Sequence, residues 1–580
     1  MLYVPRFVVF VACLQHVLCW QSAFLDPNDR IELSWDVDDV AAEITFNVSA
    51  KTNGWVGVGF TPSGGMKDAD IIVMWIADGE VHFSDRHATR QQVPIVDEVQ
   101  NYELLDASEI GGTTFFSFRR SIDTCDITQD YFIEDGTSQI IYAFGETDPA
   151  GNDPSQHLNT NRGVRSVLLL DAPLGDIPVD ETVKTIEFRS PSVPVPSTAD
   201  TTYWCSMHRG PVIDKPHQYI GNKAIVQKGN ENIVHHYALY ECELNEEHNA
   251  EYFEQLLVDY AGGFSCYDPN SPIGALTSCQ SLRVVWATGG IGDVYPAEAG
   301  YPIHKSTDSP LYYKLEMHYD NAAFEDGIVD SSGVLMYYTD NLRPHDVGIL
   351  VAAMPVLYAQ LIPPGVEEFV SVGHAAPECT AKYIPEEGIN VFSILHHSHL
   401  AGRRMRTRLF RNGAEEPWLL NDNHYDFNYQ QTRLLSEERK LYPGDQITVE
   451  CYLSTSNRKK ATLGGLSTYD EMCESFILYY PAMSLGFGES HPSLEYIHEI
   501  FGFENVTMNI DTMEYWVGDQ LMEDVLLDFD WGNFDLESYQ NRIRYGEHFG
   551  ICAANVLEAE EGIIVSYPDV EEYQEPPRQC

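Results

Sequence analysis

The sequence predicts an all-β protein built from several β-sandwich domains. Short runs of β-branched and aromatic residues, separated by turns rich in Asp, Asn and Gly, recur along most of the chain. Helical periodicity is scarce, and its best examples are the short segments 251–260 and 536–548. A chain of 580 residues is also too long for one hydrophobic core, so two to four domains are expected.

Residues 26–150 predict a first small sandwich, followed by a linker. Its expected strands are 31–35, 42–48, 55–60, 71–76 and 80–84, with 131–134 and 140–144 closing the unit. Residues 151–200 are first polar and then rich in proline, which is typical of an extended segment that crosses to the next domain.

The rest of the chain predicts two further β-domains and a C-terminal extension. Strand patterns continue at 223–226, 233–240, 312–319, 333–338, 391–395 and 446–453. Histidine-bearing strands fall into two clusters, which suggests two domains in tandem, 201–342 and 343–500, with a loose boundary near 339–346. Residues 501–580 are acidic and mixed in pattern, and we treat them as the extension.

The N-terminus and the cysteines indicate the secretory pathway. Arg6 precedes an apolar run at 7–18, and small residues that follow it offer cleavage points, so 1–22 is predicted as a signal peptide. No other stretch is long and apolar enough to span a membrane. Beyond the signal, ten of the twelve cysteines remain, without a CxxC pair, which favours disulfides in a secretory lumen or outside the cell. Asn47 and Asn505 begin glycosylation sequons.

The charge balance excludes some partners. The chain has 88 acidic against 35 basic residues and a formal net charge of −53. Nucleic acids and anionic membranes are bound through basic patches, so neither is an expected partner. The excess of acidic residues predicts a solvated acidic surface. An alternative role for the same charge is to attract small cations, such as amines, to the protein.

A cluster of histidines at 396–399 is the strongest chemical signal. Residues two apart in a strand share a face, so His397 and His399 would present two imidazoles side by side to a metal. His396 would point to the other side and act structurally. The alternative for the whole segment is a partly exposed polar strand.

A second set of candidates is less decisive from the residues alone. His235 and His236 are adjacent, so a regular strand would turn them to opposite faces. His318 lies in an alternating strand, where a lone histidine is more often structural. Met472 would ordinarily be core, but beside imidazoles its thioether would favour Cu(I) over zinc. His304 is a nearby competitor for His318.

The residues taken together resemble the ascorbate-dependent type II copper monooxygenases, in particular the dopamine β-hydroxylase-like branch. Residues 53–60 (NGWVGVGF) and 66–70 (MKDAD) are similar to a DOMON domain. The further matching segments are 202–205 (TYWC), 233–236 (IVHH), 315–319 (LEMHY), 397–403 (HSHLAGR), 422–425 (DNHY), 464–465 (GG) and 471–473 (EMC). They follow the order of the family over nearly the whole mature chain, so chance agreement is a poor explanation.

The resemblance implies a fold and two copper ions per chain. A DOMON sandwich at 26–150 would precede two jelly-roll-like copper domains, at 201–342 and 343–500. The first copper would be bound by His235, His236 and His318, and the second, where oxygen and substrate react, by His397, His399 and Met472. An open cleft would separate the two sites. Ascorbate would supply the electrons.

The resemblance also implies cysteine pairs. They are Cys205–Cys266, Cys242–Cys279, Cys379–Cys552, Cys451–Cys473 and Cys125–Cys580. This scheme uses all ten cysteines, so any homodimer would be non-covalent.

The predicted function is hydroxylation of a C–H bond in a small, amine-bearing hydrophobic substrate, with O2 and ascorbate as co-substrates. The peptide-amidating branch has an arginine two residues before its His-x-His, and this chain has Leu395 there. Asp470 and Glu471 are candidates to bind the amine. Two alternatives stay open, namely a copper carrier without turnover and a secreted glycoprotein whose DOMON domain binds a ligand. Related DOMON domains bind haem or sugars, and Met66, Met74, His82 and His87 are candidate axial ligands here.

Overall fold

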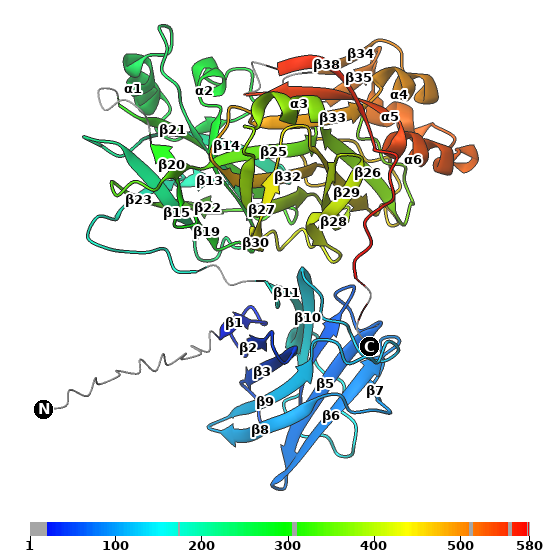
Figure 1. Ribbon diagram of the computed structural model, residues 1–580. Helices are drawn as coiled ribbons and strands as arrows, with labels where there is room; N and C mark the ends of the chain where they lie inside the picture. Colours follow the sequence, from blue (N-terminus) through cyan, green and yellow to red (C-terminus); the bar gives the residue numbers. More distant parts are fainter. Residues whose placement is uncertain are drawn as a thin grey trace, which may run out of the picture. The chain divides into compact units, whose positions relative to one another are not determined.

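The computed structural model describes residues 20–171, 175–303, 310–509, 514–554, 559–576 and 578. Most of the predicted signal peptide, His304 and Cys580 therefore lie outside the described residues. The chain divides into two compact units, one formed mainly by residues 1–170 and the other mainly by 171–577 (Figure 1). Among the described residues, no helix is long and apolar enough to cross a membrane.

The first unit is a two-layer sandwich. One sheet has the order β1-β2-β3-β9-β8 and the other β11-β10-β4-β5-β6-β7. The strands are β1 Gln21–Phe24, β2 Ile31–Asp38, β3 Glu43–Ala50, β4 Val56–Thr61, β5 Ala69–Ala77, β6 Glu80–Ala88, β7 Ile95–Val96, β8 Glu103–Ile110, β9 Thr113–Ser121, β10 Thr137–Phe144 and β11 Arg162–Leu168. Alternate residues of β3 are buried, and Phe46 packs against Phe60 and Phe118 from both layers. The buried residues of each sheet therefore face the other sheet and form the core between the two layers.

The second unit begins with another sandwich. Its sheets run β12-β23-β15-β20-β24, with β19 beside β15, and β17-β14-β21-β16-β18. The strands are β12 Lys184–Arg189, β14 Thr201–Arg209, β15 His217–Ile225, β16 Val234–Glu241, β17 Phe264–Ser265, β18 Ser281–Ala287, β19 Gly292–Val294, β20 Ala299–Ile303, β21 Tyr312–Asp320, β23 Gly333–Thr339 and β24 His345–Asp346. Helices α1 Ala250–Asp259 and α2 Ile273–Thr277 lie outside the sheets. The short strands β13 Val193–Pro194 and β22 Val329–Asp330 pair with each other.

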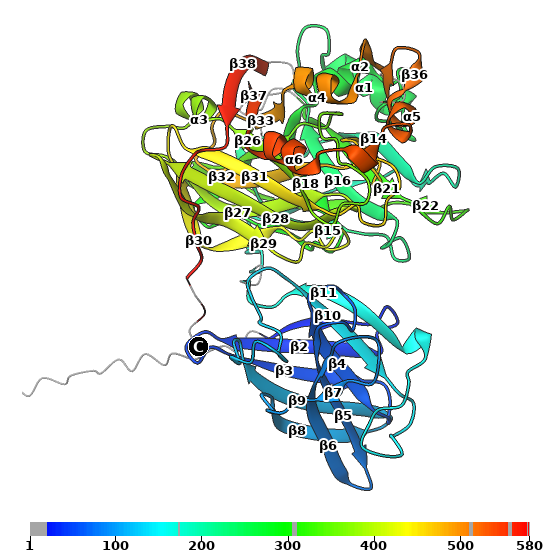
Figure 2. The same ribbon diagram turned by 90° about the vertical axis from the view of Figure 1, so that its right-hand side faces the viewer.

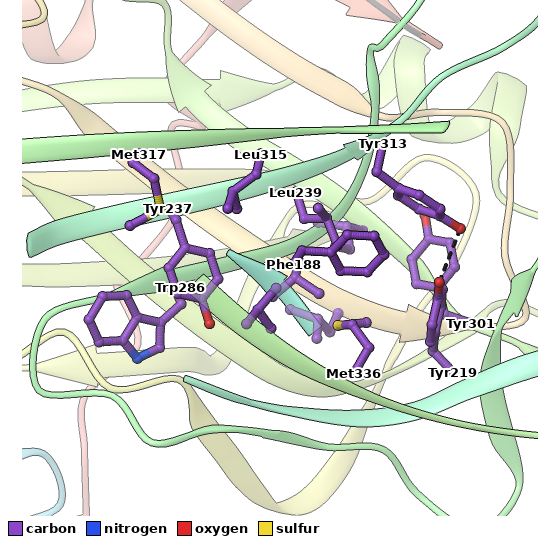
Figure 3. Close-up of a cluster of buried hydrophobic side chains, with 14 of the residues drawn as sticks. Phe188, Tyr219, Tyr237, Leu239, Trp286, Tyr301, Tyr313, Leu315, Met317 and Met336 are labelled. Atoms are coloured by element: carbon purple, nitrogen blue, oxygen red, sulfur yellow. Dashed lines mark hydrogen bonds between the residues drawn. The ribbon is translucent and has the colours of Figure 1, made fainter. Parts of the chain in front are cut away.

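Aromatic side chains fill the core between these two sheets. Phe188 from β12 packs against Tyr313 from β21, and Tyr237 stacks on Trp286. The buried hydroxyl of Tyr219 donates a hydrogen bond to that of Tyr313 across the core, at 3.1 Å (Figure 3). The layer is therefore fixed by both packing and a satisfied polar contact.

A second sandwich follows in the same unit. Its sheets run β30-β27-β32-β25-β33-β37-β38 and β26-β31-β28-β29. The strands are β25 Gly348–Met354, β26 Phe369–Ala375, β27 Ile389–Ser398, β28 Gly402–Arg411, β29 Ala414–Asp422, β30 Arg433–Leu441, β31 Gln446–Leu453, β32 Cys473–Tyr480, β33 Phe487–Pro492, β37 Glu547–Ala553 and β38 Ala559–Ser566. The strands β34 Val506–Asn509, β35 Glu514–Val517 and β36 Gln520–Leu521 form a small sheet. The remaining helices are α3 Pro377–Tyr383, α4 Leu494–Phe501, α5 Met522–Leu527 and α6 Leu536–Tyr545 (Figure 2).

The predicted all-β fold class with tandem sandwiches is confirmed, and the segments between domains contribute more than expected. Strand β11 lies inside the predicted linker and pairs with β10, because Val167 and Leu169 enter the core of the first sandwich. The C-terminal extension adds β37 and β38 to the seven-stranded sheet. Its helix α6 packs on β26, where the Tyr539 and Phe369 rings lie 5.9 Å apart.

Four disulfides connect the second unit internally. They are Cys205–Cys266, Cys242–Cys279, Cys379–Cys552 and Cys451–Cys473, the pairs that the resemblance implied. Cys125 is also disulfide-bonded, and its expected partner Cys580 lies outside the described residues.

Candidate metal centre

Three histidines from two neighbouring strands meet in the first sandwich of the second unit. His235 and His236 lie on β16, and His318 lies on β21. The pairing of these strands shifts register between Val234 and His236, which face the consecutive residues Tyr319 and His318. His235 is therefore the extra residue of a β-bulge. The bulge removes the difficulty that adjacent strand residues face opposite sides, because both rings can turn toward His318.

The three imidazoles offer their Nδ1 atoms to one point. His236 Nδ1 lies 3.0 Å from His235 Nδ1 and 3.3 Å from His318 Nδ1. Nitrogens at these separations can all lie about 2 Å from a single ion. The potential ligand atoms of the three residues form a group that could hold a metal.

Burial keeps these imidazoles neutral. It lowers the pKa of His235 to about 3, with the nearby His397 as a smaller cause. Burial also lowers the pKa of His236 and His318 well below the ordinary value. A neutral imidazole has the lone pair that a metal needs, so the site is ready to bind an ion near neutral pH.

A second pair of histidines lies at the end of β27. His397 Nδ1 donates a hydrogen bond of 2.7 Å to the side-chain oxygen of Gln430, which leaves Nε2 as the coordinating atom. The ring of His399 lies 5.3 Å from that of His397. Both ring nitrogens of His399 are buried, and around them lie the other histidines and the backbone of Ser467 and Asp470. A buried imidazole in this state fits a metal ligand.

Met472 and His399 adjoin the same end of a strand pair. Strand β27 pairs with β32 as far as Ser398 opposite Cys473, and His399 follows the one residue while Met472 precedes the other. Met472 is buried, and Cys473 beside it is tied to Cys451. The disulfide therefore fixes the position of Cys473, which directly follows Met472.

Glu471 holds the turn that carries His399. Its carboxylate accepts hydrogen bonds from Ser398 Oγ at 2.9 Å, from the backbone N–H of His399 at 3.0 Å and from that of Ala401 at 2.5 Å. Its side chain is fully buried. The expectation that Glu471 binds a substrate amine is therefore wrong, because its oxygens are already used to fix the backbone at the site.

His396 takes the structural role predicted for it. Its Nε2 bonds with Thr407 Oγ1 at 2.9 Å on β28, in the other layer of the sandwich. It therefore lies apart from the two histidines that flank the site.

The two histidine sets lie in ring contact. The centroids of His236 and His397 are 5.2 Å apart, and those of His235 and His397 are 6.2 Å apart. The Gln430 amide spans the junction, because its nitrogen lies 3.3 Å from His235 Nε2 while its oxygen accepts from His397. Phe427 from the same loop stacks on His235 at 4.2 Å. The expectation of an open cleft is corrected, since the rings of His236 and His397 lie 5.2 Å apart and Gln430 contacts both histidine sets.

Comparison with known proteins gives this site a context. The model for the copper type II ascorbate-dependent monooxygenase, N-terminal domain, matches residues 186–325, and the one for its C-terminal domain matches 345–501. The DOMON domain model matches residues 27–145. DBH-like monooxygenase protein 1 from Mus musculus is 36% identical over 494 residues, covering 85% of this chain and 78% of the relative. Dopamine beta-hydroxylase from Rattus norvegicus is 31% identical, covering 86% and 79%.

The chain belongs to the copper type II ascorbate-dependent monooxygenases. Membership implies copper, and the donor sets of this chain fit that metal. Three imidazoles suit copper, and two imidazoles with a thioether suit its reduced state. The convergence of the ligand atoms of His235, His236 and His318 is the observation that favours a bound ion over structural histidines.

Three residues that support this monooxygenase site were missed from the sequence. Gln430 and Phe427 contact His235 from the second sandwich. Tyr203 on β14 stacks on His318, with ring centroids 4.3 Å apart. No local pattern marks them, because a lone Gln, Phe or Tyr has no spacing that indicates a ligand-supporting role.

Proposed function

We propose that this chain is an active monooxygenase that hydroxylates a C–H bond of a small, amine-bearing hydrophobic substrate in the secretory pathway. One oxygen atom of O2 would enter the C–H bond, the other would become water, and ascorbate would supply two electrons. His235, His236 and His318 would bind one copper, and His397, His399 and Met472 a second. The observation that supports the proposal is the convergence of His235, His236 and His318, with His397, His399 and Met472 buried as well.

The protein's own contribution is to hold neutral ligands in fixed positions. When bound, copper would supply the one-electron redox chemistry and the site at which O2 reacts. The Gln430 oxygen fixes the orientation of the His397 ring, and the Glu471 carboxylate fixes the backbone at His399. Stacked rings of Tyr203 and Phe427 cover His318 and His235 and reduce water access to the histidines.

A cavity of about 350 Å³ beside the site supports the choice of substrate. Tyr203 and Tyr267 line it with two rings, while Asp470, Asp268 and Glu523 add carboxylates. Its volume lies at the small end of ligand pockets, which run from about 300 to 1,000 Å³. Aromatic walls with acidic groups suit a small aromatic amine, so Asp470, unlike Glu471, stays a candidate for binding the ammonium group.

The test is turnover by the purified full-length protein. The copper-loaded chain is given ascorbate, O2 and a panel of phenylethylamines, and both O2 uptake and hydroxylated product are measured. We expect product in a one-to-one ratio with O2 consumed. Two bound coppers without substrate-dependent O2 uptake would favour the copper carrier instead.

Met472→Ile separates the two sites. The substitution removes the thioether but keeps an apolar side chain of similar size, so we expect turnover to fall at least about 100-fold, in line with loss of a metal ligand. The three-histidine site should keep its metal, so metal analysis should give one copper per chain. Met508→Leu, at an exposed position, is the matched control. Full activity of Met472→Ile would remove Met472 from the site.

A further inference from the structure

Basic residues gather in one part of the second unit. The segments 403–406 and 458–460 hold six arginines and lysines, in a chain that has only 35 basic residues against 88 acidic ones. The two segments begin close together, because the Ser454 N–H donates to the carbonyl oxygen of Ala401 at 2.8 Å. A local concentration of positive charge on an acidic protein attracts anions to that place.

A small pocket lies at these basic residues. Its volume is about 140 Å³, and it is lined by Arg403, Arg404, Glu367, Glu368, Asn423 and Tyr452. Pockets for drug-sized ligands measure roughly 300 to 1,000 Å³, so this one suits a smaller molecule. Its two guanidinium groups can donate hydrogen bonds, and its two carboxylates can accept them.

The guanidinium group of Arg403 lacks a close acidic partner. Its Nη1 donates to the carbonyl oxygens of Leu400 and Gly402, at 2.9 and 2.6 Å, and both acceptors are uncharged. Burial lowers the pKa of Arg403, while Glu471 opposes this effect and the nearby Arg458 adds to it. An anion in the pocket would stabilise this cation.

Arg404 is held in place with donor capacity to spare. Strand β28 pairs with β31 so that Arg404 lies opposite Tyr452 (Figure 2), and its guanidinium carbon is 3.7 Å from the centre of the tyrosine ring. Its Nη2 donates to Glu368 Oε2 at 3.2 Å. Its Nε is buried and has no hydrogen-bond partner among the described residues. A ligand oxygen would satisfy a donor of this kind.

The mixture of charges in the pocket restricts its ligand. Arg403 and Arg404 favour an anion, but Glu367 and Glu368 would repel an anion that has no protons to donate. An anion that also carries hydroxyl groups satisfies both pairs of residues. The ascorbate monoanion has this chemistry, since it combines an enolate oxygen with several hydroxyl groups in a small ring compound.

One tight turn separates the pocket from His399. The Gly402 N–H donates to the carbonyl oxygen of His399 at 3.0 Å, and Arg403 follows directly. Leu400, which accepts a hydrogen bond from Arg403, is the residue after His399. A molecule bound against Arg403 is therefore next to the chain segment that carries a proposed copper ligand.

We propose that this pocket binds ascorbate as the electron donor, an inference that rests on the proposed function. The enolate oxygen faces Arg403 and Arg404, and the hydroxyl groups face Glu367 and Glu368. Each ascorbate monoanion gives one electron to a Cu(II) ion and one proton to the solvent, which leaves Cu(I) and the ascorbyl radical anion. A second ascorbate supplies the second electron. The amine substrate uses the separate acidic cavity, so co-substrates of opposite charge bind at different surfaces.

The first test is binding of ascorbate to the metal-free, full-length chain, followed by anaerobic calorimetry at low salt. We expect one site per chain, and an affinity that falls at least about tenfold when Arg403→Gln and Arg404→Gln are combined. Arg209→Gln, at an exposed position on β14, is the matched control and should bind normally. Thermal melting checks folding, and Lys459→Glu, at an exposed position, should weaken binding without a change in the pocket lining.

The second test is reduction of bound Cu(II), followed by rapid-freeze electron paramagnetic resonance. At equal copper loading, the double variant should be reduced by ascorbate at least about tenfold more slowly, with a weaker dependence on salt. Reduction by hydroquinone, an uncharged donor, should be unchanged. An equal loss of rate with both donors would place the effect in the copper sites and overturn the proposal.

Other outcomes would also overturn the assignment. They are a metal-free chain that does not bind ascorbate, a double variant that binds it as the unaltered chain does, and displacement of ascorbate by an equal concentration of sulfate. Sulfate displacement would indicate a general anion patch. Neither readout requires a hydroxylated product. A chain that binds ascorbate here and reduces its copper, but hydroxylates no amine, would contradict the proposed function alone.

Discussion

At the scale of single residues, the metal centre depends on side chains that are not ligands. Glu471 uses three hydrogen bonds to hold the backbone around His399, and Gln430 contacts one histidine of each set. Such supporting contacts fix ring orientation and ligand basicity. The Glu471 carboxylate next to Met472 is occupied by two backbone N–H groups and the Ser398 hydroxyl.

Replacing Gln430 tests this support. Gln430→Leu removes the acceptor for His397 Nδ1 and the contact with His235, so we expect kcat and copper affinity at the His397 site to fall about 10- to 100-fold. Gln430→Glu keeps an acceptor for His397 and should recover most of the copper affinity. Isothermal copper titration and steady-state kinetics provide the two readouts. Unchanged copper affinity in Gln430→Leu would show that the Gln430 amide does not support the His397 site.

At the scale of elements, sequence periodicity predicts strands well and their irregularities poorly. Alternation over 31–35 and 42–48 marked β2 and β3, and the helix expected at 251–260 is α1 at Ala250–Asp259. The β-bulge at His235 has no signature, because it arises from the pairing of β16 with β21 rather than from either strand alone. The assumption of a regular strand therefore predicts the wrong geometry for the adjacent His235 and His236.

The same reasoning applies to the candidate sites. His397 and His399 could be predicted because their spacing of two is a property of one strand. The closeness of His236 to His397 could not, because the two residues lie some 160 positions apart and meet only through the packing of two sandwiches.

Removal of the Cys451–Cys473 disulfide tests whether the pairing of strands holds Met472 in position. Its two ends lie on β31 and β32, 22 residues apart. Replacing both cysteines with alanine should cost about 3 kcal/mol of unfolding free energy from the loop released in the unfolded chain. It should also free Met472, so metal analysis should fall toward one copper per chain.

The Cys242–Cys279 pair provides the control. It closes a loop of 37 residues in the first sandwich, at the end of β16 away from His235 and His236. Its removal should cost a similar unfolding free energy, measured by urea denaturation, while both coppers remain. If the two double variants lose copper equally, the disulfide at Cys473 has no special role at the site.

At the scale of the whole molecule, buried histidines lower the stability of the fold in acid, and buried carboxyl groups lower it as the pH rises. Burial lowers the pKa of His208 and of His548 to about 4, and both lie away from the copper ligands. Burial also raises the pKa of Asp85 to about 9 and that of Glu489 to about 7. Each group is held in its neutral form by the fold, although the two classes become charged on opposite sides of neutrality.

The signs of these shifts predict a stability maximum in mildly acidic solution. The histidines contribute stability that is present above their unfolded pKa near 6.5 and is lost as the pH falls toward 4. The carboxyl groups contribute stability that is present below their unfolded pKa near 4 and is lost as the pH rises through 7 and 9. Each group changes the unfolding free energy by at most about 1.4 kcal/mol per pH unit in its window. We therefore expect the urea midpoint of the metal-free protein to peak between about pH 5 and 7.

Two substitutions separate the limbs of this profile. His548→Gln removes an imidazole that would become charged in acid on unfolding, so the acidic limb should become shallower while the alkaline limb stays the same. Asp85→Asn should make the alkaline limb above pH 7 shallower, because the pKa of Asp85 is raised to about 9 and the amide cannot ionise as the pH rises. Urea midpoints measured from pH 4 to 9 on each variant give the comparison. A profile that rises steadily to pH 9 would contradict the argument, since buried carboxyl groups must then cost nothing when they ionise.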